Sequence, residues 1–253
     1  MIISTDSEQH ASARAVVTGA GSGLGLAVVA ALVQAGAVVV GVDLAGSGRA
    51  ERVEAAGGTF EACDVTDEGA WERLAREIAR TQATLNLLVL NAGIMTRSPQ
   101  APIDDDVFAL AGSAGYRRMF AVNVDGVTLG IKHMRPLLEP GAAITVTASE
   151  AGLGGQTLDP YYSMSKHAVV GLVRSVAPLL LASHIRINAL CPGGIDTAIV
   201  PHALRGVVPS DAFRAPALIA QSLLAMAARP TTGGTWQPTA DGDVVEYQVP
   251  PHK

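Results

Sequence analysis

The chain has 253 residues, of which 49% are hydrophobic, 16% charged and only 4% aromatic, and its formal net charge is −5. This balance excludes intrinsic disorder, which requires more charge and fewer apolar residues. It also argues against a nucleic-acid partner, because such proteins need a basic surface. Cys63 and Cys191 are too few and too far apart for a disulfide-stapled scaffold. We interpret them as buried small hydrophobes in a reducing compartment, so a cytoplasmic location is expected.

The N-terminal residues 1–13 are polar and lack the basic and apolar regions of a signal peptide, so we predict a flexible lead-in. Two apolar stretches, Leu26–Val42 and Ala168–Ala182, are the candidates for membrane spans. Polar or turn-forming residues interrupt both, and neither has the ~20 clean residues that a span needs. A helix followed by a buried strand explains the first stretch better, so no membrane partner is expected.

Apolar, β-branched runs alternate along the chain with segments of helical periodicity. The predicted strands are Arg14–Thr18, Ala37–Val42, Gly58–Ala62, Leu85–Leu90, Ala142–Thr147 and Ile185–Leu190. The predicted helices are Leu24–Gln34, Ala50–Ala56, Glu68–Ala79, Tyr116–Leu138, Tyr161–Leu181 and Pro216–Ala228. This alternation predicts one α/β domain over residues 14–253, doubly wound, with a parallel sheet of about seven strands and helices on both faces.

A glycine-rich segment, Thr18–Gly25, joins the first predicted strand to the first helix. Glycines let the backbone turn sharply and approach a pyrophosphate, which the free N–H groups of the helix start would bind. The other interpretation is an ordinary strand–helix turn, but an acid at the end of the next strand favours a dinucleotide. The contacts predicted in this loop are Gly19, Ser22, Gly23 and Leu24.

That acid is Asp43. Its carboxylate would accept hydrogen bonds from the adenosine ribose and repel a 2′-phosphate, so the predicted cofactor is NAD. No basic residue lies in the glycine loop or directly after Asp43. Arg49 is the nearest candidate for the opposite preference, and it is expected to be solvated. Alternatively, Asp43 only caps a turn.

Later motifs complete a resemblance to the short-chain dehydrogenase/reductase family, from Arg14 to about Gly242. The loop has the family spacing Thr-Gly-x3-Gly-x-Gly, and Tyr162 and Lys166 match its Tyr-x3-Lys pair, 13 residues after Ser149. The resemblance implies a Rossmann-like fold, a nicotinamide dinucleotide and a homo-oligomer, either a tetramer or a dimer. Further cofactor contacts implied by matching motifs are Asp64, Val65, Asn91, Ala92, Gly93, Pro192, Gly193, Ile195 and Thr197.

Tyr162 and Lys166 are one helical turn apart and point the same way. A nearby ammonium and an oxidised nicotinamide would both lower the tyrosine pKa, so that Tyr162 takes the proton of a substrate alcohol. By the resemblance, Lys166 also binds the nicotinamide ribose, Ser149 holds the substrate oxygen, and Asn123 holds a water that links Lys166 to solvent. The alternatives are a core tyrosine, a strand-end cap at Ser149 and a bond across a helix kink at Asn123.

No metal site is predicted, because His133, His167 and His184 lack ligand spacing with each other or with the cysteines. The acidic run at residues 104–106 is interpreted as a solvated approach to a helix. Pro178 removes a hydrogen bond inside the predicted helix Tyr161–Leu181, which predicts a kink.

Residues 198–215 correspond to the variable substrate lid of the family and carry few charges. They predict a mainly apolar pocket for a hydrophobic alcohol or ketone. Near the end of the chain, Trp236 is predicted on the last strand, and the tail with Tyr247 could reach a neighbouring subunit.

We therefore predict an NAD-dependent oxidoreductase that interconverts a secondary alcohol and a ketone, with a hydrophobic substrate that is cyclic or aromatic. One alternative is a protein that senses NAD(H) without turnover, since a sensor needs only the glycine loop and Asp43. The other is an NADPH-dependent ketoreductase, which Asp43 disfavours.

Overall fold

The computed structural model describes residues 13–81, 84–100, 106–205 and 212–248. Its centre is an eight-stranded sheet in the order β3-β2-β1-β4-β5-β6-β7-β8. All neighbouring strands pair in parallel except β7 and β8, which are antiparallel. The strands are β1 Arg14–Thr18, β2 Val38–Asp43, β3 Thr59–Ala62, β4 Leu85–Leu90, β5 Leu138–Thr147, β6 Arg186–Leu190, β7 Thr235–Pro238 and β8 Val244–Glu246.

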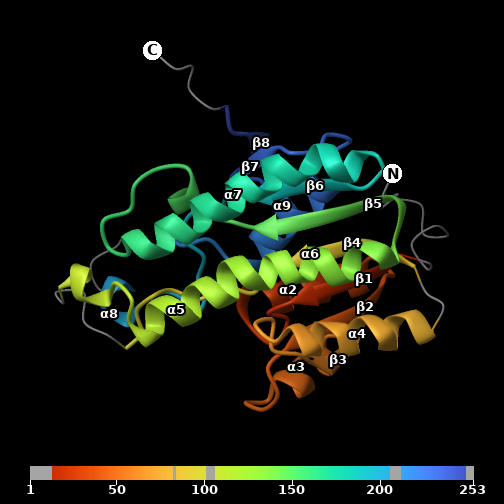
Figure 1. Cartoon of the computed structure of the whole chain (residues 1–253), viewed down its shortest axis with the longest axis horizontal. Helices are drawn as coiled ribbons and strands as arrows, with labels where there is room; N and C mark the ends of the chain where they lie inside the picture. Colours follow the sequence, from red (N-terminus) through yellow and green to blue (C-terminus); the bar gives the residue numbers. More distant parts are fainter. Residues whose placement is uncertain (1–12, 82–83, 101–105, 206–211, 249–253) are drawn as a thin grey trace.

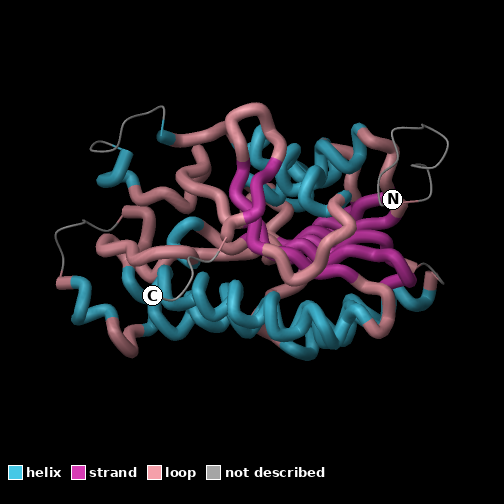
Figure 2. Tube along the Cα trace, turned by 90° about the horizontal axis from the view of Figure 1, so that it is seen from above, coloured by secondary structure: helices cyan, strands magenta, loops and turns pink. Residues whose placement is uncertain are grey.

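The helices cover both faces of this sheet, as Figure 2 shows from above. The α-helices are α2 Gly23–Gln34, α3 Arg49–Ala55, α4 Glu68–Arg80, α5 Ala114–Phe120, α6 Gly126–Met134, α7 Pro160–Leu181, α8 His202–Arg205 and α9 Pro216–Ala228. The shorter helical segments are η1 Val107–Leu110, η2 Ala121–Asp125, η3 Arg135–Leu137 and η4 Glu150–Gly152. The predicted doubly wound α/β fold is thus confirmed.

Alternate residues of each strand enter two separate hydrophobic layers. The helices α4, α6 and α7 lie on one side of the sheet, and α2 and α9 lie on the other (Figure 1). On β1, Val16 packs in the layer built by α4, α6 and α7, whereas Ala15 and Val17 pack in the layer built by α2, α3 and α9. Burial on both faces explains why these strands are continuously apolar in the sequence. The strand order reverses between β1 and β4, and ligands of such sheets bind beside that point at the carboxyl ends of the strands.

Three sequence expectations need correction. The sheet has an eighth strand, β8, so Trp236 on β7 is not on the last one. The predicted helix Tyr116–Leu138 is divided into α5, a π-helical turn at η2, α6 and η3. Leu138, placed at the end of that helix, begins β5 instead, because Pro136 in η3 ends the helical run.

The helix α7 continues through Pro178 to Leu181, so the proline lies in its last turn and does not end it. Among the described residues, α7 is also the one helix long and apolar enough to cross a membrane. Its buried residues Val169, Val170 and Val173 pack in the core layer described above. Its length and apolar composition are thus those of a core helix.

Candidate active site

The glycine loop between β1 and α2 has a backbone that leaves room for a ligand. Gly19 and Gly23 adopt φ angles of +66° and +52°, which side chains rarely allow. A Cβ atom on Gly25 would lie 2.1 Å from the carbonyl oxygen of Gly19, so only glycine fits there. The side chain of Ser22, the N-cap of α2, makes no capping hydrogen bond with a described group. The first N–H groups of α2 are therefore available to an anion.

Asp43 lies at the end of β2, directly beside this loop. Its carboxylate accepts hydrogen bonds from the N–H of Gly21 at 2.9 Å and of Leu44 at 2.7 Å. Arg49 at the start of α3 forms an ion pair with the same carboxylate, with Nε 3.1 Å from Oδ1. Contrary to expectation, Arg49 is not solvated: it is half-buried and packs against Gly21, because α3 turns back over the loop.

The carboxyl ends of β1 and β4 are joined by a side chain that the sequence analysis did not assign. The hydroxyl oxygen of Thr18 accepts hydrogen bonds from the N–H groups of Asn91 and Ala92, at 2.9 and 3.0 Å. The amide of Asn91 donates back to the Thr18 carbonyl at 3.0 Å. This pairing fixes the Asn91-Ala92-Gly93 turn at the floor of the site.

Tyr162 and Lys166 project from the first turns of α7 toward the same edge of the sheet. The ammonium nitrogen of Lys166 lies 5.5 Å from the centre of the Tyr162 ring and donates to the Thr147 carbonyl at 2.8 Å. Lys166 is only 3% exposed. The neighbouring Tyr161 points elsewhere, with its ring edge-to-face on Tyr116 at 5.3 Å.

Burial governs the ionisation of both side chains. It raises the pKa of Tyr162 to about 12, against the opposing effect of a hydrogen bond with Ser149. It lowers the pKa of Lys166 to about 8. The expected lowering of the tyrosine pKa by its lysine is therefore not found with the protein's own groups, because desolvation is the larger effect.

Ser149 and Asn123 take different positions. Ser149 is a strand-end cap, the N-cap of η4, because its hydroxyl accepts from the N–H of Ala151 at 3.2 Å. Its side chain also interacts with Tyr162. The side chain of Asn123 is buried in the π-turn of η2, where it bonds both backbone groups of Ile94 at 2.9 and 3.0 Å and the hydroxyl of Ser165 at 3.1 Å. The amide of Asn123 thus holds the turn after β4 against the helices.

One cavity of about 820 Å³ connects these groups at the carboxyl edge of the sheet. Every predicted cofactor contact lies on its wall, and so does Ser149, whereas Asn123 lies behind it. The wall also includes part of the predicted lid, namely Ala198, Ile199, Val200, Pro201 and Phe213. The rest of the lid at residues 206–211, and residues 1–12, 104 and 105, lie outside the described residues.

Comparison with known proteins identifies the family. A family model described as Enoyl-(Acyl carrier protein) reductase matches residues 19–218. Cis-4-hydroxycyclohexanecarboxylate dehydrogenase of Sinomonas cyclohexanicum is 37% identical over 216 residues, which cover 83% of this chain and 84% of the relative. Cis-2,3-dihydrobiphenyl-2,3-diol dehydrogenase of Pseudomonas sp. (strain KKS102) is 36% identical over 189 residues, or 72% and 66% of the two chains.

The chain belongs to the short-chain dehydrogenase/reductase family. Solved structures of similar fold include a 3-ketoacyl-(acyl-carrier-protein) reductase from Brucella melitensis complexed with NADH, with a TM-score of 0.77 and 24% identity over 91% of this chain and 97% of the other. The Pseudomonas aeruginosa RhlG/NADP active-site complex has a TM-score of 0.75 and 26% identity, over 91% and 95% of the two chains. These family members hold nicotinamide dinucleotides, and the dehydrogenase relatives support an oxidoreductase.

The site of this family member fits such a dinucleotide. The uncapped start of α2 has N–H groups free for a pyrophosphate, and Asp43, Tyr162 and Lys166 line the same cavity. Sequence reasoning missed several polar residues of the wall, which therefore is less apolar than the lid segment suggested. They are Arg117, Arg118, Glu150 and Gln156.

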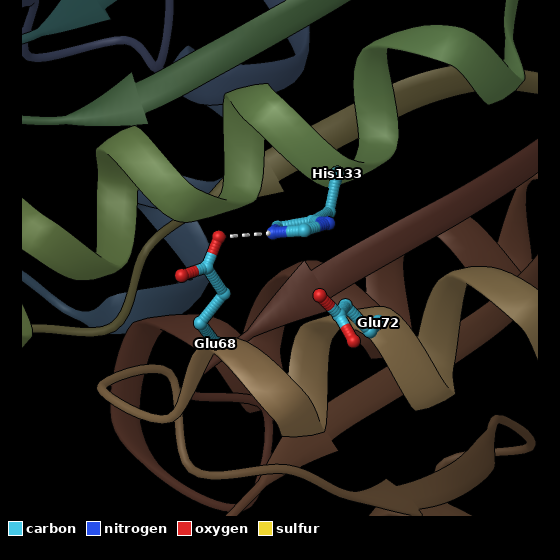
Figure 3. A group of neighbouring side chains, drawn as sticks. All are labelled: Glu68, Glu72 and His133. Carbon is cyan, nitrogen blue, oxygen red and sulfur yellow. Dashed lines mark hydrogen bonds and ion pairs between the residues drawn. The ribbon is translucent and has the colours of Figure 1, made fainter.

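A second group of possible metal ligands lies away from the cavity, on α4 and α6. Figure 3 shows Glu68 and Glu72 on one helix facing His133 on the other. Glu68 accepts from His133 Nε2 at 3.1 Å and forms an ion pair with Lys132. These contacts hold the Glu68 pKa below its usual range. Because Lys132 and His133 already engage this carboxylate, the cluster is interpreted as a polar link between the two helices.

Proposed function

We propose that the protein is an NAD-dependent dehydrogenase that interconverts a hydrophobic cyclic secondary alcohol and its ketone. The observation that carries this proposal is the group of Tyr162, Ser149 and Lys166 in the cavity that the glycine loop and Asp43 also line. A protein that only senses the dinucleotide has no use for this group. The names of both dehydrogenase relatives describe cyclic hydroxyl compounds, which supports the cyclic substrate class.

In the proposed reaction, Ser149 and Tyr162 hold the alcohol oxygen between them. The dinucleotide supplies a hydride acceptor for the alcohol carbon and, when oxidised, a positive charge. In oxidation, the Tyr162 oxygen takes the hydroxyl proton; in reduction, it returns that proton to the carbonyl. Because burial holds the Tyr162 pKa at about 12, the protein's own groups favour the protonated, donating form. Oxidation therefore depends on the added positive charge.

Asp43 supports NAD over NADP, since two backbone N–H groups hold its carboxylate at the adenosine end. Arg49 partly neutralises that carboxylate, and this contact is the specific observation in favour of the alternative, an NADPH-dependent ketoreductase. A dinucleotide bound through Asp43 would replace the Arg49 contact with ribose hydroxyls. The two N–H contacts support NAD, because they fix the carboxylate without Arg49.

The substrate end of the cavity also suggests what the alcohol carries. Arg117 and Arg118 lie on its wall, and neither forms an ion pair within the described part of the chain. A ring alcohol with an acidic group would suit these cations. The substrate in the name of the first relative, cis-4-hydroxycyclohexanecarboxylate, is an alcohol of this kind. The substrate panel should therefore include hydroxycyclohexanecarboxylates beside uncharged cyclic alcohols.

We further propose a cytoplasmic homo-oligomer. On α7, Met164 near its start and Leu179 and Leu181 in its last turn are 44%, 73% and 54% exposed, and we propose that a second copy covers them. Both cysteines are free and buried, as suits a reducing compartment. Light scattering of the purified protein tests the assembly, and a monomer at micromolar concentration would contradict it.

The test of the function is a screen with NAD+ and NADP+ against cyclic, aromatic and aliphatic secondary alcohols, following the reduced cofactor by its absorbance. Tyr162→Phe should lower kcat by about 10²-fold or more. Tyr161→Phe is the matched control and should retain activity, because Tyr161 packs on Tyr116. Tight NAD binding without turnover of any substrate would favour the sensor, and full activity of Tyr162→Phe would refute the acid–base role.

A further inference from the structure

Asp159 is a buried carboxylate that the proposed reaction does not use. It is the N-cap of α7 and is 0% exposed. One of its oxygens accepts from the N–H of Tyr162 at 3.0 Å, and the other accepts from the N–H of Thr96 at 2.9 Å. Its own N–H donates to Gln156, a residue of the cavity wall, at 2.8 Å. Asp159 therefore connects the helix of the catalytic tyrosine to the loop after β4.

Helix capping alone does not require a buried carboxylate. Asp67 caps α4 with a hydrogen bond of 2.9 Å to the N–H of Gly69, but its side chain is half exposed. Ser113 caps α5 with an uncharged hydroxyl, 3.1 Å from the N–H of Tyr116. A charged group removed from water needs compensating hydrogen bonds, whereas an uncharged serine cap does not need them. The feature that sets Asp159 apart is its second acceptor oxygen, which reaches another segment.

That second segment leads into the wall of the cavity. Thr96 follows Ile94 and Met95, both on the cavity wall, and Ile94 is in turn bonded to Asn123. A shift of Asp159 would thus move the Tyr162 backbone and this wall together. Asp159 therefore couples the position of Tyr162 to that of this wall.

The negative charge of Asp159 also lies close to the tyrosine whose proton moves. A negative charge in a poorly hydrated environment disfavours the phenolate, and it adds to the effect of burial on the Tyr162 pKa. The hydrogen bond with Ser149 opposes it. The charged or titratable groups on the elements packed against α7 include Glu150 on η4, Asp125 on η2, Arg186 on β6, and Tyr116, Arg117 and Arg118 on α5. Lys166 on α7 and Cys191 after β6 lie close to the Tyr162 ring or act on its pKa.

We propose that Asp159 is a positioning residue that joins the helix of Tyr162 to the loop after β4 and places a buried negative charge beside Tyr162. The proposal rests on the acid–base role proposed above for Tyr162. It assigns no contact between Asp159 and substrate or cofactor.

The test compares Asp159→Asn and Asp159→Ser with Asp67→Asn, the matched change at an exposed cap. Asparagine removes the charge and one acceptor, whereas serine keeps only the cap to Tyr162. Both Asp159 variants should move the midpoint of the pH profile for alcohol oxidation down by about half a unit to one unit. They should raise KM severalfold more than they lower kcat, since the wall segment loses its anchor. Asp67→Asn should change neither quantity.

A second readout does not depend on turnover. Ultraviolet difference titration of tyrosine ionisation, with Tyr162→Phe as the reference, reports the Tyr162 pKa directly. It should fall in both Asp159 variants, even if no substrate has been found and the proposed function has failed. An unchanged Tyr162 midpoint overturns the proposal. Failure of both Asp159 variants to fold, while Asp67→Asn folds, assigns Asp159 to stability alone and also overturns it.

Discussion

Replacing Lys166 by methionine should make the protein more stable at neutral pH while abolishing its activity. The lysine is 3% exposed, and burial lowers its pKa from 10.5 to about 8. Methionine has a similar length and no charge, so it removes the desolvation of the ammonium without leaving a large cavity. Lys166 would then lower the stability of the fold, and its presence would be explained by its function.

The magnitude follows from the pKa difference between the unfolded and folded chains. At pH 7 Lys166 is protonated in both the unfolded and the folded chain. Its pKa is about 2.5 units lower in the folded chain, which corresponds to about 3 kcal/mol of lost folding stability. Methionine also loses the hydrogen bond to the Thr147 carbonyl, which is worth about 1 kcal/mol. The expected net gain at pH 7 is about 2 kcal/mol, or roughly 4–8 °C in Tm.

The sign of the pH dependence makes this prediction specific. Between pH 8 and pH 10.5 the unfolded chain binds more protons than the folded one, so the wild-type protein regains stability as the pH rises. The advantage of Lys166→Met should therefore vanish near pH 10. Urea unfolding at pH 7, 8, 9 and 10 measures it, with Lys132→Met as the surface control. A variant less stable than wild type at pH 7, or a difference independent of pH, would refute the reasoning.

The remaining predictions concern the cofactor and the tyrosine. Asp43→Ala should lower the NAD:NADP ratio of kcat/KM by about 10-fold or more, because Arg49 then faces the 2′-phosphate unpaired; an unchanged ratio would contradict Asp43 as the determinant. Gly25→Ala should abolish dinucleotide binding in a fluorescence titration, since its Cβ would lie 2.1 Å from a backbone oxygen, whereas Gly171→Ala, with open space around it, should bind normally. Above pH 10 the unfolded chain loses the Tyr162 proton while the folded chain keeps it to about pH 12, so stability should fall there, and fall less in Tyr162→Phe.

Local sequence patterns were sufficient for most of the fold. The strand Leu85–Leu90 and the helix Pro216–Ala228 have the predicted bounds, because apolar runs and helical periodicity are properties of the segment itself. The break in the predicted helix Tyr116–Leu138 is different in kind. The amide of Asn123 bonds Ile94 across the core, and that partner is remote in the sequence. The three-residue strand β8 likewise exists only through its pairing with β7.

In the candidate site, too, local motifs predict some residues, whereas contacts between remote segments could not be predicted. Parallel strands bring their carboxyl ends to one edge, so residues predicted from motifs at separate strand ends meet there without further information. Arg49 was misjudged because its partner, Asp43, is brought close only when α3 folds back on the glycine loop. Asp159 carries a readable signal, an aspartate directly before Pro160 at a helix start, which predicts an N-cap. Its second bond to Thr96 has no such signal.

Burial gives Tyr162 and Lys166 opposite shifts that together favour a neutral pair. It raises the tyrosine pKa to about 12 and lowers the lysine pKa to about 8, so near pH 8 the phenol keeps its proton while the ammonium begins to lose its own. The low dielectric that opposes charge here also strengthens the field of any charge that enters. A positively charged dinucleotide ring beside Tyr162 would therefore lower its pKa more than a surface cation could. The same burial that prevents ionisation in the protein alone makes the tyrosine responsive to the redox state of its cofactor.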